Sequence, residues 1–451
     1  MLQGDEIEKL RDGTLQLDCP VMVLRKSSAN DTDVYEGGGY IRRTPDGDLR
    51  FRLYSARERD LTRVFRSFGV SGQLIADEEF YELSARDSRG RVWESNRILP
   101  DHDSCAGEKG VVTSGRLDIA TCTQREATSS AKTRSGVKWI FFDKFSIPCH
   151  AFTEKTTSIA GHTRQKRSLR DTAVFKSCGC NFEMRAVEGI VTCSAITNSK
   201  SLPPNLEIRV VEVLRFVLAR PIEWAVLEKY EGETEIIQIK RVDVHERKPS
   251  IGRPIASKAP SDSRFVWELF DKYLSYVLNY TETDRYSPVS TFVYKVIKAS
   301  EGSIDGLALV LAVAVEGVLE EAFPDLAHLS EEEIDKLKAA QQIVDKTPLD
   351  MGLKKRIKTV LGQWVHPSTT DKLTEFVKAG TIKASEYEAW KKLRHPFVHG
   401  SLPEIERIGE LVNLCYLTTM LLYKLIFRAI GYESSYTDYG APGWPLVGKK
   451  E

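Results

Sequence analysis

The amino-acid sequence predicts an α+β fold: a β-rich N-terminal domain over residues 1–245, a linker over 246–263 and an all-α bundle over 264–451. The first part contains short runs of β-branched and aromatic residues separated by Gly, Asp and Ser, which is typical of strands. In the last part apolar residues recur every three or four positions, which is typical of helices. The segment between them is polar and contains three prolines, as linkers do.

The first domain is expected to consist of strands with one helix late in the sequence. The expected strands are the segments 14–24, 34–42, 49–54, 80–85, 137–142, 224–229 and 235–242. The helix is expected over 206–220, because Val210, Leu214 and Val217 lie on one face and Pro221 prevents its continuation. We expect this helix to pack within the β-rich domain.

The second domain is expected to be a bundle of amphipathic helices. Ser330 with Glu333 and Ser385 with Glu388 each fit a capping box, in which two side chains satisfy free amides at a helix start. The last helix, over 403–430, has an unusually wide apolar face. Such a face packs against two neighbouring helices or against another subunit.

Composition and charge describe an ordinary globular protein of 451 residues. Hydrophobic residues make up 41% of the chain and charged residues 28%. Lys plus Arg and Asp plus Glu are equal at 64 each, so no strong overall field attracts nucleic acid. A role in nucleic-acid binding therefore requires a local site.

A cytoplasmic location without membrane insertion is expected. The N-terminus is acidic and lacks the apolar core of a signal peptide, and the longest apolar run, 307–315, is shorter than a membrane span. The eight cysteines are scattered, which favours reduced thiols. Cys178, Cys180 and Cys193 lack the paired spacing of a structural zinc site, so neither a metal nor a cofactor is expected.

The candidate functional stretch has the sequence RHPFVHG, residues 394–400. Arg394 is a permanent cation that can hold a phosphate, and His399 can transfer protons near neutral pH. Pro396 disfavours helical geometry in the preceding residue, so we expect a helix to end at Arg394 and the pair to bracket a tight junction. Chance produces the same spacing in Arg97 and His102, which follow a predicted hairpin and lack helical surroundings.

An acidic residue on an earlier helix is expected to support this stretch. Glu316 interrupts the apolar run that ends at residue 315. Burying a carboxylate there without a partner is costly, and an arginine or histidine of residues 394–400 is a natural partner. The alternative places Glu316 at the rim of the apolar stripe.

Residues 394–400 resemble the R-x4-6-H motif of HEPN domains (higher eukaryotes and prokaryotes nucleotide-binding). In that family the residue after the arginine is often Asn, Asp or His, as His395 is here, and an acidic residue such as Glu316 often supports the motif. The resemblance covers about residues 264–440. With its β-rich first half and its C-terminal end, the whole chain is similar to the ApeA type of bacterial anti-phage HEPN ribonucleases.

The resemblance implies metal-independent RNA cleavage in anti-phage (abortive infection) defence. The 2′-OH of one nucleotide attacks the adjacent phosphate, with His399 as general base or acid, Arg394 neutralising the growing charge and His395 positioning either group. It also implies a homodimer through the C-terminal helical domain. The β-rich half is then expected to sense a trigger, such as a phage-derived one, or to restrain the nuclease. The RNA, for which tRNA is one option, is not identified by the sequence.

A basic run is expected to hold the RNA backbone. It lies on a predicted helix with Leu353 turned inward. Its members are Lys354, Lys355, Arg356 and Lys358.

Three alternatives remain for the candidate stretch. The same pair in a non-catalytic HEPN module would bind nucleotide, RNA or a protein partner. The chain could also be a structural dimerisation protein, and Arg394 with His399 could simply cap carbonyls at a helix end. A complete Arg/His pair favours catalysis, because a pure binding module does not need both.

Overall fold

A computed structural model describes residues 1–27, 34–55, 75–101, 111–125, 135–142, 145–159, 162–242, 251–256, 259–282, 285–327, 329–364, 367–398 and 408–448. The chain divides into two compact units. Unit 1 contains residues 1–204 and 222–246, and unit 2 contains residues 205–221 and 247–451. A large antiparallel sheet forms the N-terminal part and helices dominate the C-terminal part, so the predicted α+β fold is confirmed.

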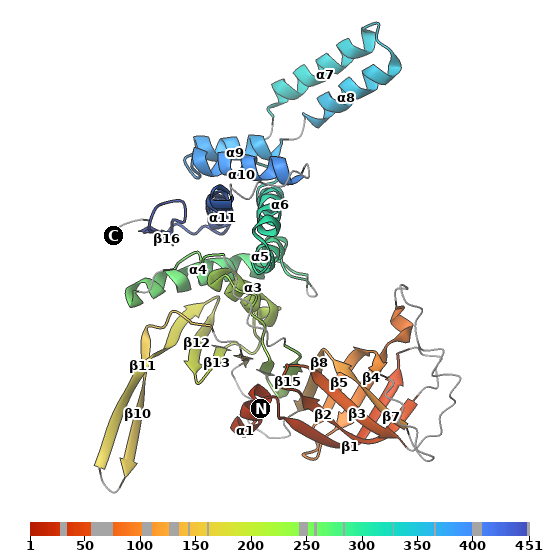
Figure 1. The fold of residues 1–451 in the computed structure, drawn as a ribbon, viewed down its shortest axis with the longest axis vertical. Helices are drawn as coiled ribbons and strands as arrows, with labels where there is room; N and C mark the ends of the chain where they lie inside the picture. The colour runs from red at the N-terminus through yellow and green to blue at the C-terminus, as the bar shows by residue number, and fades with distance from the viewer. Residues whose placement is uncertain are drawn as a thin grey trace. The chain divides into compact units, whose positions relative to one another are not determined.

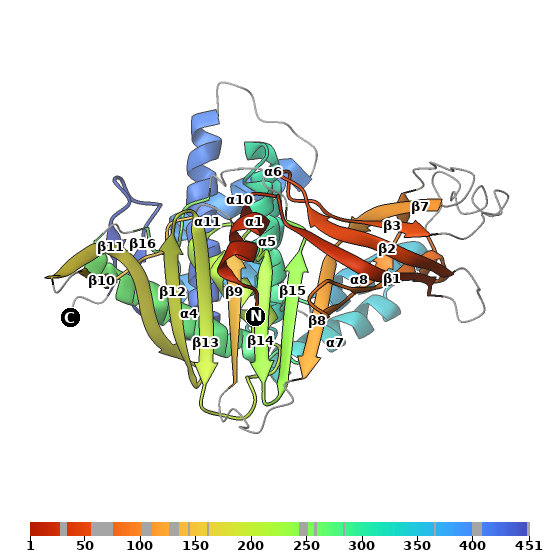
Figure 2. The ribbon, with the colours of Figure 1, turned by 90° about the horizontal axis from the view of Figure 1, so that it is seen from below.

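Unit 1 is built around one sheet of fifteen strands among the described residues (Figures 1 and 2). The order across the sheet is β10-β11-β12-β13-β9-β14-β15-β8-β5-β4-β1-β2-β3-β7-β6. The strands are β1 (Gln16–Lys26), β2 (Val34–Arg43), β3 (Leu49–Ser55), β4 (Tyr81–Arg86), β5 (Val92–Ile98), β6 (Pro100–Asp101), β7 (Val111–Leu117), β8 (Ile119–Arg125), β9 (Ser135–Phe141), β10 (Ala151–Ile159), β11 (His162–Ser177), β12 (Cys180–Val187), β13 (Ile190–Thr197), β14 (Val226–Glu231) and β15 (Thr234–Lys240).

The seven predicted strands are all present, within two residues or so at each end. Their alternation is clear in β3, where Phe51 and Leu53 are buried and Tyr54 is exposed. The sequence prediction missed β5–β8 and β10–β13. Polar residues break the apolar alternation in many of these strands, so the two-residue period that marks a half-buried strand is weak in the sequence.

The glycines of β2 allow a close approach between strands. A Cβ at Gly37 or Gly39 would lie 1.9 Å from a backbone oxygen of β3, so only glycine fits at these positions. The pairing with β1 shifts here, because Cys19 pairs with Gly39 and Met22 with Gly37. The extra residue of this bulge therefore lies in β1, opposite Gly38.

A short helix, α1 (Gly4–Arg11), is fixed to the β4–β5 hairpin by a buried charge cluster. Arg91 donates to Glu6 at 2.8 Å and to Asp87 at 2.7 Å, and Trp93 Nε1 donates to Asp87 at 3.0 Å. Glu6, Asp87 and Arg91 are all buried. Because each charge has an opposite partner, burial does not leave an isolated ion.

Unit 2 is a helical bundle with two short C-terminal strands, β16 (Tyr436–Thr437) and β17 (Leu446–Val447). Its longer helices are α3 (Leu206–Leu218), α4 (Ser263–Leu278), α5 (Pro288–Ala299), α6 (Ile304–Ala322), α7 (Glu331–Lys346), α8 (Met351–Gln363), α9 (Thr369–Lys378), α10 (Ala384–Val398) and α11 (Ile408–Ile430). Ser330 and Glu333 form the predicted capping box at the start of α7. The predicted box of Ser385 and Glu388 is wrong, since α10 begins one residue earlier and Glu386 accepts the Lys383 amide.

The helix expected to pack with the strands belongs instead to unit 2. α3 packs against α4 and α5, and nearly all its side chains are buried, including charged ones. Arg209 donates to the carbonyls of Tyr280 and Arg285, and Glu212 accepts the Ser287 amide. The sequence showed an apolar stripe but not the buried Arg209–Glu212 pair, which requires polar partners that the loop between α4 and α5 supplies.

The wide apolar face of α11 is largely covered within its own unit. α11 packs against α4, α6 and α10, and every residue from 418 to 427 is buried. By length and composition α11 could cross a membrane, yet 67% of its most apolar window is buried inside the unit, as in a core helix of a soluble protein. Leu421 is fully buried, so it is not part of a surface that could pair two subunits; Leu414 is half-buried.

Candidate functional site

Arg394 and Glu316 form an ion pair between α10 and α6. Arg394 Nε donates to Glu316 Oε1. This confirms the predicted contact between Glu316 and a cation of residues 394–400. Half of the Arg394 side chain is exposed and about a third of Glu316 is, so the pair lies at the surface rather than in the core.

The helices that carry this pair are held together by buried neighbours. Trp390, one turn before Arg394, is 1% exposed and its Nε1 donates to the Ala312 carbonyl of α6 at 3.1 Å. The guanidinium of Arg394 lies over the Trp390 ring, 5.7 Å from its centroid. The indole thus anchors α10 on α6 and offers a favourable cation–π surface to the arginine. The sequence prediction did not include Trp390 in the site.

Glu316 is followed by a glycine that lets a third helix approach. A Cβ at Gly317 would lie 2.1 Å from the ring of Phe292 on α5. The glycine therefore allows α5 and α6 to pack closely directly beside Glu316. This packing holds the α6 backbone next to Glu316, and α10 packs against the same helix.

The ion pair leaves much of the guanidinium available. The hydrogen bond engages Nε, and an arginine has two further terminal nitrogens that carry donors. A guanidinium held by a carboxylate at one edge can present another edge to a phosphate in a bidentate manner. An exposed pair contributes little to stability, on the order of 0–1 kcal/mol, so its main physical effect is to orient the arginine.

The predicted helix end at Arg394 is wrong. α10 continues through Pro396 to Val398, so Arg394 lies within the helix. A proline removes one backbone hydrogen bond and crowds the carbonyl of Lys392, but its own φ angle is helical. Trp390 and Leu393 are buried one turn earlier, and their packing stabilises the helical backbone that leads into this turn. The restriction on the residue before proline is a preference, and here the helix overrides it.

The other members of the predicted site are only partly covered by the structure. His395 lies in the α10 backbone, but its side chain is outside the described residues, as is all of His399. The structure therefore brings Arg394 and Glu316 together and does not describe their distance from either histidine.

Two lysines of the basic run on α8 contact an acidic residue of α7. Lys358 Nζ lies 2.9 Å from a carboxylate oxygen of Asp345 on α7, and Lys354 Nζ donates to the Asp345 carbonyl at 2.7 Å. Lys355 and Arg356 are exposed. Asp345 thus contacts two of the four cations that are predicted to hold RNA. Leu353, expected to face inward, is 42% exposed, because α8 packs mainly on α7.

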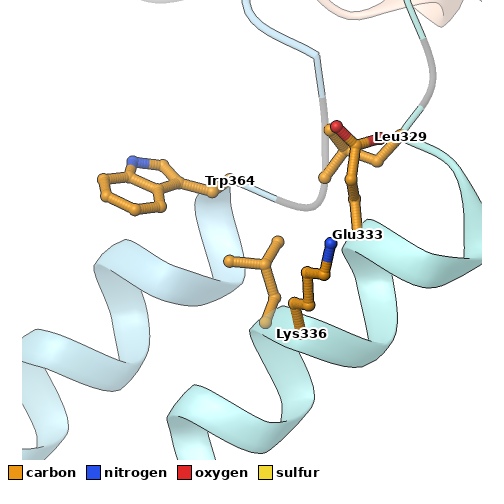
Figure 3. A pocket seen from close by; sticks show the side chains of 5 residues that line it. Leu329, Glu333, Lys336 and Trp364 are labelled. Carbon is orange, nitrogen blue, oxygen red and sulfur yellow. The ribbon is translucent and has the colours of Figure 1, made fainter.

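A shallow pocket of about 310 Å3 lies between the ends of α7 and α8 (Figure 3). Leu329, Glu333, Lys336, Leu337 and Trp364 line it. Its walls are mostly apolar carbon, and it contains none of the residues proposed for catalysis.

The second Arg/His match has a structural partner. Arg97, at an exposed position of β5, makes an ion pair with Asp77 at 2.9 Å and lies 4.5 Å from the Phe80 ring centroid. His102 lies outside the described residues. These contacts agree with the interpretation of Arg97 as a surface residue.

Two cysteines of the sheet have the environment of structural thiols. Cys180 and Cys193 are buried in the neighbouring strands β12 and β13, and burial raises the pKa of the Cys180 thiol to about 11 and that of Cys193 further. Among the described residues, no group of three or more His, Cys, Asp or Glu side chains is arranged to hold a metal ion.

No family model matches this chain, and the searches of curated proteins and of solved structures found no significant match either.

Proposed function

We propose that this protein is a metal-independent endoribonuclease whose active site contains Arg394 and His399. The observation that carries the proposal is the Arg394–Glu316 pair, in which a half-exposed arginine is oriented by a carboxylate and an indole. The resemblance of residues 394–400 to the R-x4-6-H motif of HEPN domains supplies the reaction.

In this reaction the 2′-OH of one nucleotide attacks the adjacent phosphorus. A base removes the 2′-OH proton, the O2′–P bond forms, and the P–O5′ bond breaks with protonation of the leaving oxygen. The products are a 2′,3′-cyclic phosphate and a 5′-OH. The reaction consumes no oxidant and needs no metal-bound water as nucleophile, because the attacking group belongs to the substrate.

His399 has the chemistry to transfer these protons, since imidazole titrates near neutral pH. Arg394 neutralises the charge that develops on the phosphate oxygens. Glu316 is a positioning residue, because it acts through the orientation of Arg394. His395 is proposed to orient His399 or the substrate.

Two copies of the chain are proposed to form the working enzyme, with their motifs facing each other through the helical domains. A single Arg/His pair offers few groups for binding and cleaving a phosphodiester, and a second pair doubles the local positive charge of a chain with no net charge. Lys355 and Arg356 are the exposed cations of α8 that are proposed to contact the RNA backbone. A cytoplasmic location and a role in anti-phage defence belong to the same proposal.

The test is cleavage of total RNA by the purified full chain in excess EDTA. Wild type is expected to cleave, and Arg394→Ala and His399→Ala each lower the rate by at least about a hundredfold. Arg428→Ala is the matched control, because Arg428 is an exposed arginine of the same unit outside the motif. Absence of cleavage by the folded wild type in the presence and absence of divalent metal would overturn the proposal.

A binding module is the second candidate, and it rests on the same pair. A guanidinium already engaged by a carboxylate can serve as a ligand-orienting group without catalysis. Such a module would bind nucleotide, RNA or a protein partner, and Arg394→Ala would weaken binding while no RNA is cut.

A further inference from the structure

The outward face of three neighbouring strands in unit 1 carries a regular array of arginines and tyrosines. β2, β3 and β7 pair side by side (Figure 2), and residues directly opposite each other share a face. We call this the arginine–tyrosine face. Its members are Tyr40 and Arg42 of β2, Arg50, Arg52 and Tyr54 of β3, and Arg116 of β7.

The register places three arginines in one row across the sheet. Arg42 pairs with Arg50, and Arg50 pairs with Arg116. Like charges directly opposite each other on a sheet are destabilising, since their side chains leave the backbone about 5 Å apart. The three aligned arginines therefore destabilise the folded state locally. The pairing of the strands alone gives no reason for placing them there.

Carboxylates compensate this row only in part. Asp48 lies 3.2 Å from Arg50 and 3.3 Å from Arg116, and it also reaches Arg241 at 4.0 Å. Asp48 thus contacts three guanidinium groups, Arg241 also reaches Asp118 at 3.7 Å, and the nearby charge of Asp46 acts on Arg50 and Arg116. Arg42 is exposed, and within the described part of the chain it makes no ion pair.

The aromatic members lie beside the arginines. The guanidinium of Arg42 lies 5.6 Å from the Tyr40 ring centroid, and that of Arg52 lies 5.6 Å from the Tyr54 ring centroid. Tyr54 is 48% exposed. A tyrosine on the opposite face of the same sheet could be buried. Its partner across β2 is Gly38, so no side chain stands opposite the ring on that strand.

We propose that the arginine–tyrosine face binds single-stranded nucleic acid. Arginines in a row attract the phosphates of one strand, and the exposed Tyr54, which stands opposite Gly38 on β2, offers a ring on which an unpaired base can stack. Guanidinium groups that lie over the tyrosine rings extend the stacking surface. A polyanion would also relieve the repulsion between Arg42, Arg50 and Arg116.

A single strand fits this face better than a duplex does. The array is part of a sheet and contains flat rings, whereas bases in a duplex are already stacked and do not offer their faces to tyrosines. An acidic peptide could neutralise the arginines, but it would leave Tyr54 without a function. The proposal concerns unit 1 alone and does not depend on the proposed cleavage by Arg394 and His399.

The test uses fluorescence anisotropy with a labelled thirty-residue oligo(dT) and the full chain. DNA lacks the 2′-OH needed for the proposed cleavage, so binding can be measured whether or not the protein is a ribonuclease. Wild type is expected to bind at 50 mM salt and to weaken as salt rises, because each phosphate contact contributes about 0.7 to the slope of log Kd against log salt. An oligo(U) arm with the His399→Ala chain compares RNA with DNA under conditions without cleavage.

Two variants separate binding from folding. Arg42→Glu places a carboxylate opposite Arg50, so thermal stability should stay the same or rise while binding weakens at least about tenfold. Tyr54→Ala removes an exposed ring and should weaken binding about fivefold or more. Arg185→Glu is the matched control, because Arg185 is an exposed arginine of β12 in the same unit, and it should bind like wild type.

Three results would overturn the proposal. One is absence of oligo(dT) binding by the wild type at micromolar concentration and 50 mM salt. Another is equal weakening by Arg42→Glu and Arg185→Glu, which would make the effect one of total charge. The third is unchanged binding by Tyr54→Ala together with tighter binding of a duplex of equal length, which would exclude stacking on single strands.

Discussion

Arg394 Nε donates to Glu316 Oε1, and this contact joins α10 to α6 at a surface where both side chains remain partly accessible. The pair contributes about 1 kcal/mol or less to stability because solvent screens it. Its consequence is geometric, since it restricts the directions in which the guanidinium can meet a phosphate.

Replacing the positioning carboxylate should lower catalysis more than stability. Glu316→Gln retains the shape and a hydrogen-bond acceptor, and we expect a loss of about threefold in kcat, whereas Glu316→Ala loses about tenfold or more. Thermal unfolding of both variants should stay close to wild type. Two results would contradict a positioning role. One is a change in KM while kcat stays at the wild-type value, and the other is a Glu316→Gln variant that is no more active than Glu316→Ala.

Lysine should not replace the motif arginine. Arg394→Lys keeps the positive charge but loses the planar fork that can bind a carboxylate and a phosphate at once, so we expect a loss of at least about tenfold in kcat/KM. Steady-state cleavage of a fluorescent RNA measures this. Wild-type rates in Arg394→Lys would show that only net charge matters.

The Arg97/His102 match should be dispensable for cleavage. Arg97→Ala and His102→Ala are expected to retain wild-type rates, because Arg97 is an exposed residue engaged by Asp77 and Phe80. The cleavage assay with total RNA applies unchanged. Loss of cleavage by a folded His102→Ala protein would move part of the site into the β-rich region.

The proposed dimer requires a different probe from the one that the sequence suggested. Leu421 is fully buried, so Leu421→Asp should unfold unit 2, at a cost of several kcal/mol, instead of producing a folded monomer. Ile408 is 48% exposed at the start of α11, and Ile408→Asp should leave the fold intact. Light scattering should give twice the chain mass for wild type; a monomer that still cuts RNA at low concentration would exclude the shared site.

The buried charge cluster of unit 1 should make that unit sensitive to acid. Burial raises the pKa of Glu6, but hydrogen bonds from Arg91 and the Gln3 amide, together with the charges of Arg91 and Arg89, outweigh it, and the pKa is lowered. Burial likewise raises the pKa of Asp87, and its bonds from Trp93 and Arg91 lower it overall. Both carboxylates thus bind protons less readily in the folded state than in the unfolded state.

The stability that these groups contribute is therefore present above their ordinary pKa values, about 4.5 and 3.8, and is lost as the pH falls through the folded values. Hydrogen exchange of peptides from β4 and β5 should show protection that declines below about pH 4.5. Glu6→Gln should lower protection at pH 7 by about 1–3 kcal/mol and flatten the decline. If protection declined just as steeply with falling pH in Glu6→Gln, Glu6 would be excluded as a source of the acid sensitivity.

The sequence predicts the fold class and many strands because burial on one face of a sheet leaves a simple alternation, as in β3. It misassigns α3 to the strands because an apolar stripe does not say what covers it, and the covering helices α4 and α5 come much later in the chain. The same limit explains α11, whose wide apolar face could pack on another subunit but is largely buried within its own unit.

At the candidate site, the sequence predicts the contact between Glu316 and a motif cation because a carboxylate in an apolar run needs a partner. It does not predict Trp390 beneath Arg394, since a tryptophan at helical spacing is indistinguishable from any core aromatic. The helix through Pro396 was also missed, because the local preference of a proline is visible in sequence and the tertiary packing that overrides it is not.

The central claim is that this chain cuts RNA by attack of a 2′-OH, with Arg394 and His399 as the acting residues. The most direct measurement uses a short RNA that the protein cleaves, a copy with a single 2′-deoxy nucleotide on the 5′ side of the scissile phosphate, and excess EDTA. The account predicts a 2′,3′-cyclic phosphate and a 5′-OH from the all-RNA strand, no cleavage at the modified position, and none in either strand with His399→Ala. Cleavage at the deoxy position, or unchanged cleavage by folded His399→Ala, would contradict it.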